Sequence, residues 1–364
     1  MSRASEPMTT LTLGDDEIVT VRAGGIVVAM GPTGAGKTSL IAGMLVAHAR
    51  DHGPVVVLSR ELPADELAAR MIGMQCDASW LDVLTGQVPR DQMDHALALP
   101  RMYVLDRREA TLAALVETIQ VAKAEHAGAP VLVAVDYVQI LESGERDARA
   151  KVADVMAQID DIARAYRAVV IAISQMSRAS SRAARNGESV GADSTDGGAE
   201  SAAIERYATA TLSIGQAGPD RDDGTRAIDL SIGKGRMTGG DRVIPMSYCG
   251  RSGRWRVAGE SRPAGEVKAE RASSRDATRV GVLVLAIPGA LEMAAEPMSR
   301  RDVRGALGAR DEHVRAAVEQ LLGEPESGVV EVGPRRGGSY RLWIRTRAEA
   351  AGLSVIRRPD RSPL

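Results

Sequence analysis

The sequence contains no phenylalanine, and aromatic residues make up only 2% of its 364 positions. A core must therefore be built from aliphatic side chains and methionine. Few rings are available to stack on nucleic-acid bases, so a nucleic-acid partner would be held mainly through its charged backbone. The chain also has only two cysteines, Cys76 and Cys249, and five scattered histidines. Neither set has the spacing of a disulfide framework or of a zinc site.

Long apolar runs and a charge excess are missing as well. No apolar run approaches the roughly 18 residues of a membrane-spanning helix, and the N-terminus lacks a basic segment followed by an apolar one. We therefore expect a cytoplasmic protein without a membrane partner. The formal net charge is -2. No overall positive field attracts a polyanion, so any surface for nucleic acid must be local.

Short runs of Val, Ile, Leu and Ala recur between about residue 25 and residue 257, and helical patterns fall between most of them. Continuous apolar runs are typical of parallel strands that are covered on both faces. The helical patterns cover residues 38–49, 64–74, 112–125 and 152–166. Strand and helix in repeated alternation predict an α/β domain over residues 1–257, built on an open, doubly wound sheet.

The composition changes at residues 258–278, which are polar, charged and poor in branched apolar side chains. This segment predicts a linker. Three helical patterns follow, and then two strand-like runs joined by a basic turn. The order is typical of a small winged helix-turn-helix domain, which we predict over residues 279–346. Residues 347–364 are expected to form a polar tail.

The segment GPTGAGKT, at positions 31–38, matches the phosphate-binding pattern G-x-x-x-x-G-K-[ST] between an apolar run and a helical pattern. Glycines allow successive backbone N–H groups to turn toward one anion, and the positive end of the following helix points to the same place. Lys37 would lie along the β- and γ-phosphates, and the Thr38 hydroxyl would ligate Mg²⁺. The predicted nucleotide-binding residues are Gly31, Pro32, Thr33, Gly34, Ala35, Gly36, Lys37, Thr38 and Ser39.

Two carboxylates follow apolar runs in the same domain. Asp136 ends the run that begins at Val131, and a buried aspartate at a strand end can hold the water shell of a metal. Glu61 follows the run Val55 to Leu58. If that strand lies beside the strand of the phosphate loop, Glu61 reaches the γ-phosphate and can orient the attacking water or accept its proton. Capping of the helix near Pro63 is the alternative role.

Five segments resemble, in the right order, segments of the DnaB-type replicative helicases. They are SRELPADELAARM, LVAVDYVQIL, VVIAISQMSR, GAESAAIERYA and IDLSIGKGRMTGG. With the phosphate loop they extend over about residues 25–250. The resemblance implies the fold of a RecA-like P-loop ATPase, a doubly wound α/β sheet, and the hydrolysis of ATP with Mg²⁺.

The resemblance also implies roles for single residues. Glu61 would be the catalytic glutamate, and Lys37 would act beside it on the phosphates. Asp136 would hold the metal together with Thr38. Gln175 would sense the γ-phosphate and link it to the loops that contact DNA.

Lys234 and Arg236 would reach the nucleotide of a neighbouring subunit. An arginine supplied in this way can raise the rate by roughly 10³ to 10⁵, so ATP hydrolysis would depend on assembly. A basic hairpin turn at the surface is the other interpretation of this pair. The family pattern is not matched throughout, because Tyr207 and Thr209 stand where the helicases have acidic residues. We also expect no N-terminal helical collar, and the winged helix is an addition to the family pattern.

Basic residues in two places are candidates for contacts with DNA. Arg178, Arg182 and Arg185 lie in a Ser-rich stretch at 176–198. For this region the resemblance implies contact with the phosphates of single-stranded DNA, and a solvated loop without a ligand is the alternative. Arg335 and Arg336 fall in the predicted wing, where they suit contact with phosphates or with a minor groove.

The predicted recognition helix, at about residues 310–322, is nearly neutral because it carries Asp311, Glu312 and Glu319. Acidic residues are unfavourable in a major groove. The winged helix could therefore bind duplex DNA or dock onto a replication protein, and the sequence leaves both open.

These observations predict an ATP-driven DNA helicase or translocase that forms a homo-oligomer, expected to be a hexameric ring around single-stranded DNA. Replication of a plasmid, a phage or an integrated element is the expected setting. The alternative is a nucleotide-switched DNA-binding ATPase, such as a loader, a regulator or a defence protein, which assembles on DNA without unwinding it. The added winged helix and the expected absence of the collar motivate this alternative.

Overall fold

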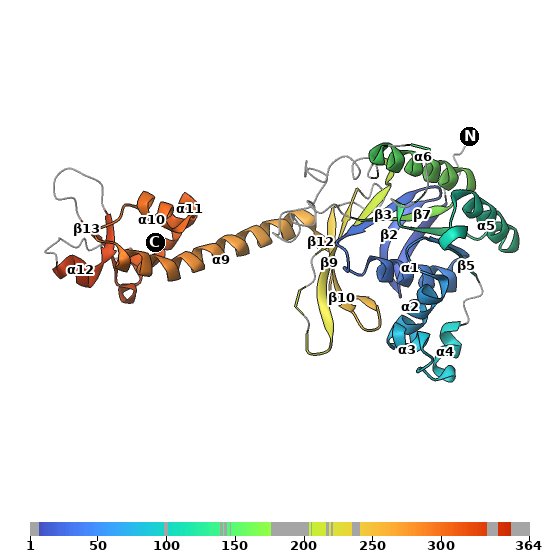
Figure 1. Cartoon of the computed structure of the whole chain (residues 1–364), viewed down its shortest axis with the longest axis horizontal. Coiled ribbons are helices and arrows are strands. Elements are labelled where there is room, and N and C mark those ends of the chain that lie inside the picture. The colour runs from blue at the N-terminus through green and yellow to red at the C-terminus, as the bar shows by residue number, and fades with distance from the viewer. Residues whose placement is uncertain are drawn as a thin grey trace. The chain divides into compact units, whose positions relative to one another are not determined.

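The computed structural model describes residues 7–97, 101–138, 141, 144–145, 147–175, 204, 206–215, 218–219, 221–234, 241–332 and 341–350. The chain divides into two compact units, Met1–Val267 and Lys268–Leu364 (Figure 1). No helix in the described part of the chain is long and apolar enough to cross a membrane.

The first unit is built on a mixed sheet of ten strands. Along the main path the order is β11 (Trp255–Val257), β10 (Arg242–Cys249), β9 (Thr225–Gly233), β8 (Ala210–Ile214), β3 (Ile26–Gly31), β7 (Val169–Gln175), β6 (Leu132–Asp136), β4 (Val55–Ser59) and β5 (Met102–Asp106). The six strands from β8 to β5 run parallel. Beyond β8 the sheet continues with antiparallel strands, and β12 (Arg262–Pro263) pairs with β10 off the main path.

The parallel strands are apolar on both sides because helices cover both faces of the sheet. In β4, Val55 and Val57 face a core that includes α1 (Lys37–Asp51) and α2 (Ala64–Cys76), whereas Val56 and Leu58 face a second core. Helices α5 (Leu112–Glu125) and α6 (Ala148–Tyr166) close this second core. The predicted doubly wound α/β fold is therefore confirmed.

The strand order differs from the predicted one, in which the strand before Glu61 lies beside the strand of the phosphate loop. β4 does not lie beside β3, because β7 and β6 intervene and β4 pairs with β6 and β5. All these strands carry the same kind of continuous apolar pattern, so their sequences could not specify which of them become neighbours.

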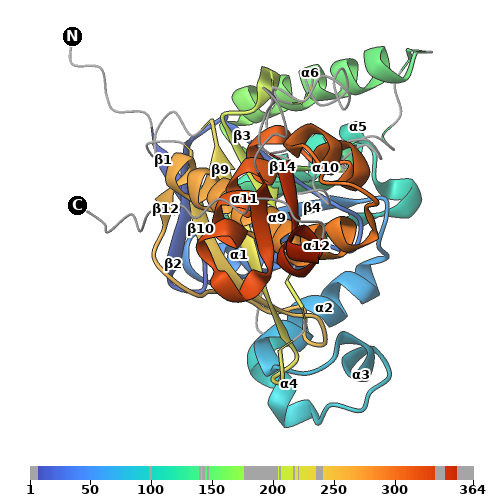
Figure 2. The ribbon, with the colours of Figure 1, turned by 90° about the vertical axis from the view of Figure 1, so that its left-hand side faces the viewer.

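Several elements of the first unit were not predicted. The hairpin of β1 (Met8–Leu13) and β2 (Asp16–Arg22) precedes the sheet and contributes to the core around α1. Two short helices, α3 (Trp80–Leu84) and α4 (Arg90–Leu97), lie beside α2 in both views (Figures 1 and 2). Arg70 of α2 stacks over the ring of Trp80, with its guanidinium carbon 4.4 Å from the ring centroid.

The segment 258–278, predicted as a polar linker, is largely regular structure. It contains β12 and the first half of α9 (Ala264–Met293). Many of its residues are Ala, Glu, Lys and Arg, which have high helix propensity. A polar composition therefore does not distinguish a solvated helix from a coil. Helix α12 (Arg345–Ala350) includes the first residues of the predicted tail, 347–350.

In the second unit the C-terminal half of α9 packs against α10 (Arg300–Leu307) and α11 (Asp311–Gly323). A two-stranded ribbon of β13 (Val329–Val332) and β14 (Arg341–Ile344) completes the core, and Met298 bridges to Leu342. Ser299 and Asp302 form a capping box at the start of α10, and Gly308 ends that helix with a φ of 60°. These elements have the order that a winged helix-turn-helix requires, and that assignment stays a prediction.

Helix α5 offers a matched test of the core beneath the sheet. Ile119 has no exposed surface, whereas Val121 on the same helix is 48% exposed. We expect Ile119→Ala to lower the free energy of unfolding by about 2–5 kcal/mol, because it leaves a cavity. Val121→Ala should change it by about 0.5 kcal/mol or less. Urea denaturation followed by circular dichroism measures both, and equal effects of the two variants would contradict the assigned burial.

Candidate nucleotide-binding and catalytic site

The phosphate loop connects the end of β3 at Gly31 to the start of α1 at Lys37. Gly34 and Gly36 adopt left-handed backbone conformations, with φ of 78° and 83°, which L side chains rarely adopt. The Lys37 ammonium donates to the carbonyl oxygens of Gly31 and Pro32 at 3.0 and 2.9 Å. A left-handed turn that leads into a helix N-terminus presents backbone N–H groups to an anion, so the loop fits a phosphate chain.

An aromatic pair from a distant part of the sequence supports this loop. A Cβ atom built on Gly36 would lie 3.0 Å from the Trp255 ring and 3.0 Å from the Tyr248 ring. The two rings are neighbours across β10 and β11, with centroids 4.7 Å apart. Position 36 therefore requires glycine for two reasons, its backbone angle and its contact with these rings. Sequence analysis missed both aromatic residues, because nothing in the local pattern connects them to residue 36.

Asp136 lies at the carboxyl end of β6 and is 4% exposed. The Thr38 hydroxyl of α1 donates to its Oδ2 at 3.0 Å. Its other oxygen, Oδ1, is buried and has no hydrogen-bond partner among the described residues. Burial raises the pKa of Asp136 to about 6, an effect that nearby Glu61 adds to and the Thr38 hydrogen bond opposes. A buried carboxylate with a spare oxygen beside a hydroxyl is a hard oxygen donor set, which fits Mg²⁺.

The Lys37 ammonium shares this partly buried environment. Burial lowers the pKa of Lys37, while the charges of Asp136 and Glu61 act in the opposite direction. The site therefore contains an ammonium and a carboxylate that are both short of solvent. A bound phosphate chain and a bound cation would each supply the opposite charge that one of these groups lacks.

Glu61 lies near this site because its strand, β4, pairs with β6, which ends in Asp136; β4 does not pair with β3. Ser59, the last residue of β4, is level with Asp136 in the parallel pairing, and the Arg60 N–H donates to the Asp136 carbonyl at 2.9 Å. Glu61 follows directly and is exposed. Its charge acts on both Lys37 and Asp136. The structure thus brings together Lys37, Thr38, Asp136 and Glu61 at one edge of the sheet.

The other predicted site residues are placed in part or not at all. Gln175 ends β7 with its backbone paired to Gly31, and its side chain lies outside the described part of the structure. Lys234 follows β9 and is exposed, with a left-handed φ of 53°. The remaining predicted residues lie outside the described residues: Arg178, Arg182, Arg185, Arg236, Arg335 and Arg336.

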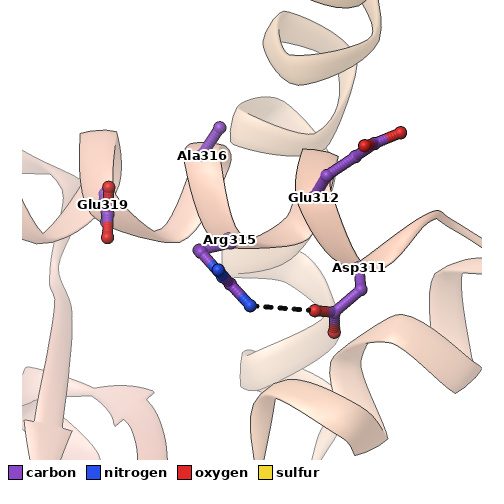
Figure 3. Close-up of a pocket in the computed structure, with 5 residues that line it drawn as sticks. All are labelled: Asp311, Glu312, Arg315, Ala316 and Glu319. Carbon is purple, nitrogen blue, oxygen red and sulfur yellow. Dashed lines mark hydrogen bonds and ion pairs between the residues drawn. The ribbon is translucent and has the colours of Figure 1, made fainter.

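In the second unit the exposed side of α11 is acidic. A shallow hollow of about 430 Å³ is lined by Asp311, Glu312, Arg315, Ala316 and Glu319 (Figure 3). The Arg315 guanidinium reaches back to Asp311 at 3.3 Å, whereas Glu319 lies farther along the helix (Figure 3). This is the predicted recognition helix, for which the sequence leaves both duplex DNA and a protein partner open, and its exposed acidic residues are unfavourable for contact with phosphates.

The sheet, the phosphate loop between β3 and α1, and the two carboxylates that end β6 and follow β4 define a P-loop protein with a RecA-like ATPase fold. The family model that describes the DnaB-like helicase C-terminal domain matches residues 9–252. The chain belongs to this family.

Two relatives are replicative DNA helicases named DnaB. The one from Synechocystis sp. is 24% identical over 162 residues, which cover 42% of this chain and 18% of that protein. The one from Helicobacter pylori is 23% identical over 152 residues, which cover 39% of this chain and 31% of that protein. The chain thus matches less than a third of the length of either relative.

Two solved structures share the fold. One is an ATPase domain, which superposes with a TM-score of 0.56 at 17% identity, over 66% of this chain and 86% of that one. The other is a DnaB-like replicative helicase, solved in a study of its interactions with primase, which superposes with a TM-score of 0.51 at 15% identity. That match covers 64% of this chain and 57% of the other.

The raised pKa of Asp136 predicts a specific pH dependence of stability. In the folded protein this pKa is about 6 instead of 3.8, so the folded state disfavours the charged form. The cost is absent below about pH 4, grows between pH 4 and 6, and is complete above pH 6. Asp136→Asn removes it, and without nucleotide and Mg²⁺ this variant should be more stable at pH 8 by up to about 3 kcal/mol.

Urea denaturation from pH 4 to pH 8 measures the difference between Asp136→Asn and the unmodified protein. The exposed substitution Asp161→Asn in α6 is the control and should leave the pH profile unchanged. A difference for Asp136→Asn that stays constant over this range would contradict the assigned cause.

Proposed function

We propose that the protein is an ATP-driven DNA helicase or translocase of DnaB type that acts as a homo-oligomeric, hexameric ring. The observation that carries this proposal is the gathering of Lys37, Thr38, Asp136 and Glu61 at the carboxyl edge of the sheet, in a chain of the DnaB-like family. A phosphate cradle alone would fit any nucleotide-binding protein. The added glutamate supplies a group that can act on water.

In the proposed mechanism each residue has one task. The loop N–H groups and Lys37 hold the phosphates. To do so, the Lys37 ammonium gives up its hydrogen bonds to the Gly31 and Pro32 carbonyls and donates to phosphate oxygens instead. Thr38 and Asp136 would hold Mg²⁺, which would neutralise charge on the phosphate oxygens when bound. Glu61 orients the attacking water and takes its proton.

A neighbouring subunit completes the proposed site. Lys234 directly follows β9, and we propose that it and Arg236, two residues farther along the chain, extend toward the next subunit's nucleotide. Hydrolysis would then require an assembled ring, as in other P-loop enzymes that receive an arginine in trans.

Arg178, Arg182 and Arg185 are proposed to hold single-stranded DNA by its phosphates. For the predicted winged helix, with Arg335 and Arg336 in the segment expected to form its wing, the sequence predicts a contact with duplex DNA or with a replication protein. The acidic exposed side of α11 favours the protein contact. Replication of a plasmid, a phage or an integrated element remains the proposed setting.

The second candidate function is a nucleotide-switched DNA-binding ATPase that assembles on DNA without unwinding it. The C-terminal unit favours it, because α9 to β14 form a separate compact domain beyond the matched family region. Slow ATP turnover that ignores single-stranded DNA, together with tight binding to a duplex sequence, would support this candidate.

Strand displacement on a forked DNA with ATP and Mg²⁺ tests the proposal. We expect unwinding by the unmodified protein and none by Lys37→Ala, which should lose nucleotide binding.

Glu61→Gln should bind a fluorescent ATP analogue with normal affinity but reduce ATP turnover by about 100-fold or more, because it loses the general base. Unchanged turnover in Glu61→Gln would remove this residue from its role. Absence of unwinding at every protein concentration would leave only the second candidate function.

Mixing two inactive variants tests the contact between subunits. Arg236→Ala lacks the proposed trans-acting guanidinium, and Glu61→Gln lacks the base, so each variant alone should hydrolyse ATP very slowly. In mixed assemblies some interfaces combine an intact Glu61 with an intact Arg236. We therefore expect ATPase activity to reappear on mixing, in proportion to the number of such interfaces. No recovery, although size-exclusion chromatography shows mixed rings, would contradict the trans contact.

A further inference from the structure

The loop that carries Glu61 is held at several points by hydrogen bonds. Ser59, which is 1% exposed, donates from its hydroxyl to the Leu62 carbonyl at 2.7 Å and accepts the Leu62 N–H at 3.1 Å. The residue before Glu61 is held by the Arg60 N–H bond to Asp136. Both chain neighbours of Glu61 are therefore tied to the end of the sheet.

A third tie comes from the opposite side of β4. The Asp106 carboxylate, at the end of β5, accepts the N–H of Ala64 at 2.8 Å. Ala64 is the first residue of α2, and the preceding Pro63 has no side chain that could cap the helix. The first N–H groups of a helix need an acceptor, and a carboxylate is also favoured by the positive end of the helix. Asp106 thus supplies from another strand the cap that the loop itself lacks.

The sheet register explains why Asp106 is available. In the parallel pairing, Ser59 is level with Asp136 on one side and with Asp106 on the other. Two aspartates therefore flank the last residue of β4. Asp136 bonds to Thr38 of α1, whereas Asp106 bonds to the start of α2.

We propose that Asp106 is a positioning residue for the reaction, which fixes the loop 60–63 and with it the direction of Glu61. The inference rests on the proposed function, because it assigns Asp106 a task only if Glu61 acts on water. Ser59 closes the loop from within, and Asp106 anchors its far end. Catalytic groups must be held within fractions of an ångström, and small displacements are costly in rate.

Asp106→Ala is expected to lower kcat for ATP by about tenfold or more while KM changes by about twofold or less, because binding does not involve the loop. Asp106→Asn keeps an oxygen that can accept the Ala64 N–H, so its kcat should stay within about threefold of the unmodified value. In Glu61→Gln, adding Asp106→Ala should cause no further loss, since the residue acts through Glu61.

Thr111→Ala is the matched control. Thr111 caps α5 by accepting the Ala114 N–H at 3.1 Å, a hydrogen bond that involves none of the residues 59–64. It should cost similar helix stability without changing kcat. Unchanged kcat in Asp106→Ala, an equal loss in Thr111→Ala, or a multiplied loss in the double variant would overturn the proposal.

Hydrogen exchange separates this inference from the proposed function. In Asp106→Ala the Ala64 amide should exchange roughly fivefold faster, the factor of a typical helix cap, and Asp106→Asn should restore its protection. Unchanged exchange would overturn the anchoring role even in a protein that hydrolyses ATP. Conversely, absent ATPase activity, or full activity in Glu61→Gln, would refute the proposed function while the exchange data still decide whether Asp106 holds the loop.

Discussion

The parallel register between β4 and β6 is the constraint on which the candidate site depends. It sets Ser59 level with Asp136, so that the Arg60 N–H donates to the Asp136 carbonyl and Glu61 follows directly beside this buried carboxylate. A slip of one residue would exchange the two faces of β4 and expose Val56 and Leu58 to the wrong core. The hydrophobic cores on both faces therefore stabilise the geometry of the acidic edge.

Asp136 connects this edge to the phosphate loop. Its side chain accepts from Thr38 of α1 while its backbone accepts from the loop after β4, so one residue joins three elements. The environment that allows this also keeps Asp136 and Lys37 away from water. Taking a charged group out of water is unfavourable unless opposite charges or hydrogen bonds compensate for it. Folding therefore places both groups where added opposite charge would be stabilising.

The C-terminal unit combines a small apolar core with an acidic exposed helix. Its core is small and aliphatic, and the capping box of α10 and the glycine at its end define the turn before α11. The buried side of α11 contributes Val314, Val318 and Leu321 to that core, and its exposed side is left acidic. A helix of this charge is better suited to meet a basic protein surface than phosphates. The second unit, which lies beyond the residues matched by the family model, therefore presents an acidic helix surface.

The sequence by itself determined the elements and the residues with local signatures. Continuous apolar runs predicted the strands from β3 to β9, and the glycine pattern identified the phosphate loop, because these signals depend only on neighbours along the chain. The winged helix is still a prediction, and the arginines proposed to contact DNA lie outside the described residues. Only the tertiary structure decided the strand order, which was predicted wrongly for β4, and the contributions of Asp106, Tyr248 and Trp255 to the site. Parallel strands with equivalent apolar patterns can pair in many orders, and the free energy of packing over the whole sheet selects one of them.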